Sequence, residues 1–329
     1  MVRKHTFADL CFDEGRTMQN RMMLGWHWPH TPTGVRSPTR NVAEQTEASW
    51  AELIESYNAV PDAFKDFFLI AEGQQFPYTV LTPSYEGFIH PTTEKLICDF
   101  QCEIYVLERN GNTFDAHCYP LEGISCIEVR MILLDSSIKI VGVTKEGVLK
   151  SSIFRFNSVS DYLFEPILQK IRYATGDTNS AAQNLELEKF DPWREINYKF
   201  MNYARRSLLA GEKVIHTVLQ PEIREPVLKG LVKKFYRVVA PTLAGILTDQ
   251  ELIMIQEEKT RSGEERYGGI WVYIPLKKIL TLSLSEVDNN LLTLSIKLTE
   301  GTCHEFLFRD SLKQELHRLR YRFQEMMIA

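Results

Sequence analysis

The sequence Tyr-Ile-Pro-Leu-Lys-Lys-Ile, Tyr273–Ile279, is the main indication of the architecture, because its pattern Pro-Leu-x-x-Ile occurs a second time in the chain. The other occurrence is Pro120–Ile124, and each copy directly follows a run rich in aromatic and β-branched residues. Such runs favour β-strands. An internal repeat determines the architecture of a whole chain, so the residues flanking both copies carry the strongest evidence for the fold.

Further short matches flank both copies in the same order. Thr79–Pro83, Thr-Val-Leu-Thr-Pro, corresponds to Thr217–Pro221, Thr-Val-Leu-Gln-Pro. After Pro-Leu-x-x-Ile, both copies continue with Glu-Gly and then Phe-x-Phe: Glu146-Gly147 and Phe154–Phe156 in the first, Glu300-Gly301 and Phe306–Phe308 in the second. Pro83 and Pro120 are 37 residues apart, whereas Pro221 and Pro275 are 54 apart. The chain is therefore a tandem repeat whose second copy carries about 17 extra residues.

Each copy is predicted to contain several short strands followed by a helix. Leu291–Leu298 alternates apolar and polar residues, which is the pattern of a half-buried strand. Asn110-Gly111 predicts a tight hairpin, because both residues tolerate positive φ. In the second copy, Asp310 or Ser311 predicts the start of a helix with one apolar face. That face consists of Leu312, Leu316, Leu319, Phe323 and Met326.

A helix is also predicted before each copy. Asp191-Pro192 marks the start of one helix, which ends near Gly211. Residues 47–72 predict two helices broken near Pro61. Residues 175–190 have the small, polar composition of a linker, and residues 1–45 are predicted to form an extended or disordered tail. The predicted domains are therefore residues 46–174 and residues 191–329.

Composition excludes several classes of protein. The 329 residues are 44% hydrophobic and 25% charged, as in an ordinary globular protein, and a net charge of −5 does not favour nucleic acid. No apolar run approaches the roughly 20 residues of a membrane span, and the first residues lack the apolar core of a signal peptide. Six cysteines do not suggest a disulfide framework. We therefore expect a cytoplasmic protein, with peripheral membrane contact as a variant.

With these elements in place, the second copy resembles the bacterial pleckstrin-homology-like (PH-like) domains, which are related to GRAM domains. The resemblance rests on the Thr-Asp-x-x-Leu strand start at Thr248–Leu252, on Ile274–Ile279 and on the closing amphipathic helix. It covers residues 213–327 and extends to residues 76–174 through the repeat. The resemblance implies an α+β fold with two PH-like β-barrel domains, each preceded by a helix and closed by a C-terminal helix.

No motif predicts an enzyme. The resembling family has no shared catalytic residues, and the sequence lacks the common signatures for nucleotides, metalloproteases and serine hydrolases. Gly268-Gly269 lies within a strand run, where a bulge or close backbone approach explains it better than a phosphate cradle. One group of potential zinc ligands lacks knuckle spacing: Cys98, Cys102, His117, Cys118 and Cys126. We interpret the cysteines of this group as small buried hydrophobic residues. We predict no cofactor and no metal.

Two segments are candidate binding sites. A basic run near the first hairpin of the second copy is a candidate site for an anionic lipid headgroup or another anionic partner. Its cations are Lys229, Lys233, Lys234 and Arg237. A solvated strand edge protected by its lysines explains the same residues. Trp26 and Trp28 are candidates for docking onto a protein partner, because tryptophans often anchor interfaces.

The sequence therefore predicts a non-catalytic binding or scaffold protein built from tandem PH-like domains. Its expected ligands are protein segments that lie on sheet edges or between a strand and a helix, and anionic lipid is a second candidate partner. The alternative is an enzyme or a regulatory subunit with a small-ligand pocket between the two domains. The sequence leaves the oligomeric state open.

Overall fold

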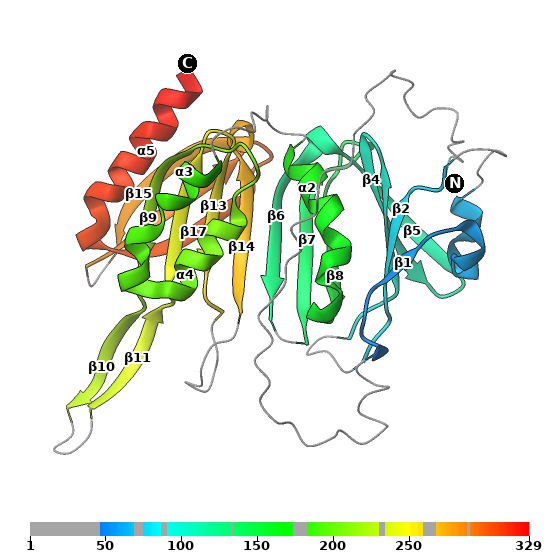
Figure 1. Ribbon diagram of the computed structural model, residues 1–329, viewed down its shortest axis with the longest axis horizontal. Helices are drawn as coiled ribbons and strands as arrows, with labels where there is room; N and C mark the ends of the chain where they lie inside the picture. The colour runs from blue at the N-terminus through cyan, green and yellow to red at the C-terminus, as the bar shows by residue number, and fades with distance from the viewer. Residues whose placement is uncertain are drawn as a thin grey trace. The chain divides into compact units, whose positions relative to one another are not determined.

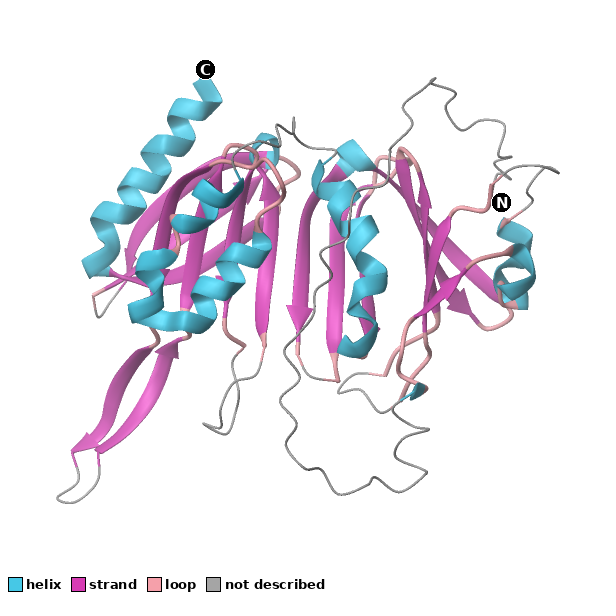
Figure 2. Cartoon of the chain, in the orientation of Figure 1, coloured by secondary structure: helices cyan, strands magenta, loops and turns pink. Residues whose placement is uncertain are grey.

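Strands are the most abundant secondary structure of the described chain (Figure 2). The computed structural model describes residues 47–68, 75–86, 91–132, 134–173, 183–229, 234–258, 268–287 and 290–328. The predicted tail over residues 1–45 lies outside these ranges, and so do Trp26 and Trp28. The chain divides into two units. The first contains the described residues up to Leu121 with Leu134–Ser136 and Phe154–Leu168, and the second contains Glu122–Leu133, Ser137–Ile153 and the residues from Gln169 onward.

The first unit is built on a five-stranded antiparallel sheet whose strands follow chain order (Figure 1). The strands are β1 (Glu52–Ile54), β2 (Tyr78–Thr82), β3 (Lys95–Phe100), β4 (Glu103–Asn110) and β5 (Thr113–Pro120). The predicted hairpin at Asn110-Gly111 is confirmed, and Gly111 has a φ of 63°, which glycine adopts without strain. Phe64 packs with Leu96 and Leu107 in the core of this unit.

The prediction of two helices over residues 47–72 is wrong in the part of this segment that the structure describes. Glu52–Ile54 forms β1, which pairs with Thr79–Leu81 of β2. Two 3-10 turns follow, η2 (Tyr57–Ala59) and η3 (Asp62–Phe67). Pro61 separates them and cannot donate a backbone hydrogen bond. Because helix nucleation is costly, these short pieces gain more from sheet pairing and from packing against the core.

The second unit contains a seven-stranded sheet in the order β8-β7-β6-β14-β13-β12-β9. Its strands are β6 (Ile124–Met131), β7 (Ser136–Val143), β8 (Leu149–Phe156), β9 (Val214–Gln220), β12 (Leu243–Thr248), β13 (Glu251–Gln256) and β14 (Gly269–Pro275). β7 belongs to this unit from Ser137, and β8 belongs to it up to Ile153. The sheet combines strands from both copies of the repeat, because β6 of the first copy pairs antiparallel with β14 of the second.

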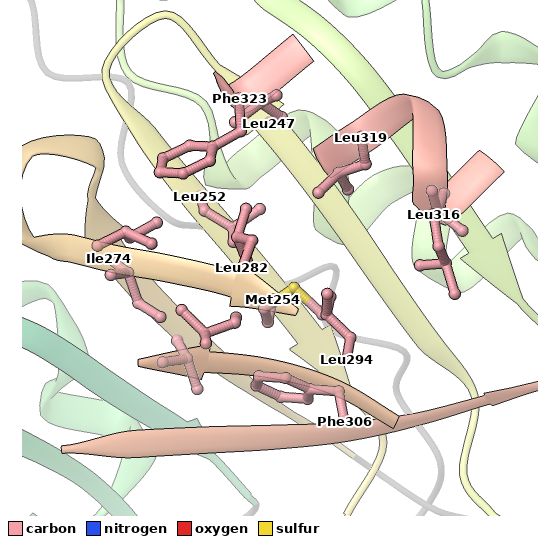
Figure 3. Packing of buried hydrophobic residues seen from close by; sticks show 14 of the residues in the cluster. Leu247, Leu252, Met254, Ile274, Leu282, Leu294, Phe306, Leu316, Leu319 and Phe323 are labelled. Carbon is pink, nitrogen blue, oxygen red and sulfur yellow. The ribbon is translucent and has the colours of Figure 1, made fainter. Parts of the chain in front are cut away.

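A three-stranded antiparallel sheet and the C-terminal helix complete the core of the second unit. The strands are β15 (Ile279–Val287), β16 (Leu291–Leu298) and β17 (Cys303–Arg309), followed by the turn η8 (Asp310–Leu312) and the helix α5 (Lys313–Ile328). Leu282, Leu294 and Phe306, one from each strand, share a buried cluster with Leu316 and Leu319 of α5 (Figure 3). The apolar face predicted for this helix is therefore the face that packs.

The remaining elements connect the sheets. The turn η5 (Ser158–Phe164) and the helix α2 (Glu165–Tyr173) end the first copy, and α3 (Gln183–Glu188) lies within the segment predicted as a linker. The turn η6 (Asp191–Trp193) and the helix α4 (Arg194–Ser207) precede the second copy, as Asp191-Pro192 predicts. β10 (Ile223–Lys229) and β11 (Lys234–Ala240) form a separate two-stranded sheet.

The order of elements confirms the internal repeat. Pro120 ends β5 and Pro275 ends β14, and each is followed by one 3-10 turn and then a strand. The turns are η4 (Leu121–Gly123) and η7 (Leu276–Lys278). Both copies thus run as four strands, three strands and a helix. The first copy contributes β2–β5, β6–β8 and α2, and the second contributes β9 with β12–β14, β15–β17 and α5.

Insertions explain the unequal lengths of the two copies. Pro83 is 12 residues from the start of β3 at Lys95, whereas Pro221 is 22 residues from the start of β12 at Leu243. The second copy is thus ten residues longer here, and the β10–β11 hairpin lies in this longer segment. The other seven of the 17 extra residues lie between the start of β13 and Pro275.

The predicted α+β class, with antiparallel sheets and a C-terminal helix, is confirmed. All four sheets are open over the described residues, so these strands do not close into the two predicted barrels. One reason is that β14 pairs with β6, so the outer side of β14 extends its sheet instead of meeting β15. In the division into units, β6 and most of β7 and β8 belong to the second unit.

Candidate functional site

Strand β15 is the candidate binding element, because over the described chain one of its sides carries no neighbouring strand. β15 pairs with β16 on one side and is the end strand of its sheet on the other. We call the outer side of Ile279–Val287 the β15 edge. Natural edge strands are usually kept from pairing by charges, prolines or short length. β15 is nine residues long, and Glu286 is its one charged residue.

Apart from Glu286, the exposed side chains of β15 are neutral. Leu280 and Val287 expose 55% and 46% of their surface, and Ser283 and Ser285 are also exposed. A long and partly apolar edge with a single charged residue is a template on which another strand can add. These properties favour an extended protein segment as the ligand of this edge.

The fold holds β15 in an extended conformation. Ile279 and Leu282 are buried in the core that α5 covers. Near its other end, Lys313 Nζ of α5 lies 2.5 Å from Glu286 Oε1. Because the strand is already ordered, it loses little conformational entropy when a segment pairs with it.

The other end of the same sheet is occupied by a side chain. Gln220 of β9 is fully buried, and its amide bridges to the backbone of β17. Its Nε2 donates to the carbonyl oxygen of Leu307 at 3.0 Å, and its Oε1 accepts from the N–H of Arg309 at 2.6 Å. Within the described residues, β15 is therefore the end of this sheet that is accessible to a partner strand.

The equivalent strand of the first copy, β6, shows how such an edge is used. Ile127–Met131 of β6 pairs antiparallel with Gly269–Tyr273 of β14. A Cβ on Gly268 would lie 2.1 Å from the carbonyl oxygen of Met131, and Gly268 has a φ of 109°. The predicted close backbone approach at Gly268-Gly269 is therefore confirmed.

A buried ion network anchors the end of α2 in the second unit. Arg172 Nε donates to Glu251 Oε1 at 3.1 Å, and its Nη2 donates to the carbonyl oxygen of Ser207 at 2.6 Å. The same guanidinium lies 3.9 Å from the centre of the Tyr273 ring. Glu212 Oε2 lies 3.8 Å from Arg172 Nη2. One buried cation thus faces two buried carboxyl groups.

The Thr-Asp-x-x-Leu signature shapes the turn that presents this network. Thr248 Oγ1 accepts from the N–H of Glu251 at 2.9 Å and lies 3.0 Å from Glu212 Oε1, to which it can donate. Asp249 Oδ1 accepts from the N–H of Lys213 at 2.9 Å. The signature therefore orients Glu251 and fixes the chain entering β9, which is a structural role.

The network predicts a pH dependence of stability through Glu212. Burial, followed by repulsion from Glu251, raises the pKa of Glu212 from 4.5 to about 8. A carboxyl group that binds its proton more tightly in the folded state stabilises below pH 4.5, and this contribution is lost as the pH rises through about 8. We expect the free energy of unfolding to fall across this window by on the order of a few kcal/mol.

The prediction is tested by measuring the free energy of unfolding with urea between about pH 5 and pH 8, the window that this pKa sets. Glu212→Gln cannot ionise and should show a flatter pH profile than the wild type. The exposed Glu305→Gln serves as the control and should keep the wild-type slope. If Glu212→Gln keeps the wild-type slope as well, Glu212 does not change its protonation on unfolding in this range.

Among the described residues, one cysteine and one histidine lie close together. Cys126 Sγ lies 3.5 Å from Nε2 of His304, the spacing of a nucleophile and a base. Burial, however, raises the pKa of the Cys126 thiol to about 12 and lowers the pKa of His304. Both shifts favour the neutral pair, which is the less reactive form.

The cavity beside the ion network is small. It is lined by Ile124, Cys126, Ile171, Arg172, Glu251 and Tyr273, among others, and its volume is about 10 Å³. That is about the space of one water molecule, which is too little for an organic substrate.

The predicted anion-binding residues lie on the β10–β11 hairpin or outside the described residues. Lys229 ends β10 and Lys234 begins β11, where the two are register partners, and Lys233 lies in the undescribed connection. Arg237 is exposed, and its Nη2 lies 3.5 Å from Glu225 Oε2 of the opposite strand. The carboxylate of Glu225 thus offsets the positive charge of Arg237 on this hairpin.

No protein-family model matches the chain, and no curated protein matches its sequence. The described helices include none that is long and apolar enough to cross a membrane. In the same residues, no group of three or more His, Cys, Asp or Glu side chains could hold a metal ion. Cys98, Cys118 and Cys126 are buried, as predicted. The prediction is wrong for Cys102, which is exposed because it lies in the turn between β3 and β4.

The sequence analysis missed the residues of the ion network and the β15 edge. Arg172 is 79 residues from Glu251, and nothing in their local patterns connects them. The edge had a detectable signal, because Ile279–Val287 is a strand-like run with one charge. Which side of that strand lacks a neighbour depends on sheet order, and only the structure shows it.

Proposed function

We propose that this protein is a non-catalytic binding or scaffold protein, built from two PH-like domains in tandem, that binds an extended protein segment on the β15 edge. The plan of four strands, three strands and a helix, found in both copies, supports the PH-like interpretation. The lack of pKa values suited to acid–base or nucleophilic work at Cys126 and His304 supports a non-catalytic role.

The observation that carries the proposal is the equivalence of β15 with β6. In the same chain, the edge of β6 already holds an antiparallel strand, β14. β15 follows the same Pro-Leu-x-x-Ile turn and lies at the end of its sheet. Backbone hydrogen bonds supply the affinity in this kind of recognition, and the alternate side chains of the added strand supply the specificity.

The strand that β6 binds is the natural probe for β15. A synthetic peptide with the sequence of β14, Gly269–Pro275, flanked by lysines for solubility, should pair with β15. Hydrogen–deuterium exchange with mass spectrometry would then show slower exchange in Ile279–Val287. At a peptide concentration about ten times the dissociation constant, we expect exchange there to slow by about tenfold.

A matched peptide controls for hydrophobic adsorption. In it, alternate backbone nitrogens are methylated, so the side chains are kept and the backbone donors are lost. This peptide should give no protection of β15. Equal protection by both peptides, or protection confined to other segments, contradicts the proposal.

The other interpretations stand as follows. An anionic lipid at Lys229, Lys233, Lys234 and Arg237 stays a prediction. The ion pair between Arg237 and Glu225 does not favour it. An enzymatic role is not proposed, because the groups closest to catalytic geometry are held in their neutral forms.

A further inference from the structure

The internal repeat makes β5 equivalent to β14 and β6 equivalent to β15. Pro120 ends β5 and Pro275 ends β14, and after one turn each leads into β6 or β15. Within the chain, β14 of the second copy pairs with β6 of the first copy. The other two strands, β5 and β15, are end strands of different sheets over the described residues. β5 and β15 are thus the repeat equivalents of β14 and β6, but they are not paired with each other within the described chain.

We infer that the β5 edge of one molecule pairs antiparallel with the β15 edge of a second copy, in the register of β14 on β6. This inference rests on the proposed function and names the partner. Within one chain the two strands belong to separate sheets, so the contact forms between molecules. The two surfaces differ, so the contact is heterologous, and repeated contacts either close into a ring or continue as a filament.

The side chains are compatible in the transferred register. Gly269 pairs with Met131, and moving both by the repeat spacing places Phe114 opposite Glu286. Asp115 then faces Ser285, Ala116 faces Leu284 and His117 faces Ser283. No two like charges face each other directly, and like-charged pairs are the combination that would oppose pairing. Thr113, Asp115 and Ala116 of β5 are exposed, as are Ser283 and Ser285 of β15.

Disulfide trapping tests the register directly in the full chain. One tagged variant carries Asp115→Cys and the other carries Ser285→Cys, in a background where Cys11, Cys102 and Cys303 are serine and the buried cysteines remain. Mild oxidation of the mixture should link the two variants. Thr281→Cys replaces Ser285→Cys in the control, because it lies about 13 Å further along the same strand. We expect the control to cross-link at least about tenfold more slowly, as strand spacing requires.

Charge at Ser285 gives an independent measurement by sedimentation velocity. Because Asp115 is its expected neighbour, Ser285→Lys should tighten self-association and Ser285→Glu should weaken it, each by about twofold to fivefold. Asp115→Lys combined with Ser285→Glu should restore it. Opposite effects of two changes at one exposed site do not arise from unfolding.

The outcomes separate this inference from the proposed function. Equal cross-linking in the test and control mixtures overturns the inference, and so does a mass that stays at 38.1 kDa at every protein concentration. If the β14 peptide still protects β15 in that case, the edge binds protein segments but not a second copy. If the peptide gives no protection and the chain does not self-associate, both proposals are wrong.

Discussion

Arg172→Met is expected to lower the melting temperature of the second unit by roughly 10 °C, corresponding to about 3–5 kcal/mol of unfolding free energy. Arg172 and Glu251 are both buried, so removing the cation leaves a carboxylate without its partner in a dry environment. The carbonyl oxygen of Ser207 also loses its donor. Breaking one side of a buried pair costs far more than the pair itself contributes.

Two further variants distinguish this explanation from a simple loss of packing. In the double variant Arg172→Met with Glu251→Met, no charge is left behind, so much of the lost stability should return. Arg172→Lys keeps the charge but cannot reach Glu251 and Ser207 with a planar fork, so it should fall between wild type and Arg172→Met. Differential scanning fluorimetry measures all three. A double variant less stable than Arg172→Met would show that the charge is not the main cause.

Gly268→Ala is expected to separate β6 from β14 and to destabilise the second unit by about 3 kcal/mol or more. A Cβ at this position would lie 2.1 Å from the Met131 carbonyl oxygen, and backbone atoms cannot move aside as a flexible side chain can. The φ of 109° adds strain for any residue other than glycine. Faster amide exchange in Ile127–Met131 should accompany the loss of stability.

Gly301→Ala is the matched control for this experiment. Gly301 also has a positive φ, 92°, but a Cβ there would meet no atom within 4 Å. Alanine at Gly301 should therefore cost only the backbone strain, about 1 kcal/mol, and should leave exchange in β6 unchanged. Equal losses in the two variants would mean that strain, not the contact with Met131, limits the position.

The sequence predicted the parts of the fold that depend on local pattern. Pro120 and Pro275 recur because each ends a strand before the same kind of turn, so the repeat was visible in the residues themselves. The apolar face of α5 was predictable for the same reason. The segment 47–68 was not, because its helical spacing competes with sheet pairing to β2, and tertiary contacts decided between them.

The candidate site depended on contacts that no local pattern contains. That β6 pairs with β14 and leaves β15 at the end of a sheet follows from pairing between strands far apart in the chain. The role of Arg172 likewise required Glu251 and Ser207 to be brought to it. Gly268-Gly269 was predictable in part: the two glycines indicated a close backbone approach, but not that β6 is the strand that approaches.

The joint between β6 and β14 also bears on how the protein is made. Met131 leaves the ribosome 144 residues before Pro275, the end of the strand that β6 must pair with. At a synthesis rate of about 5–20 residues per second, β6 remains about 7–30 s without its partner strand. During translation β6 is therefore an unpaired edge strand that other chains can pair with. Chaperones that recognise extended apolar segments have time to bind it. The chain completes this sheet only when its second copy has been synthesised.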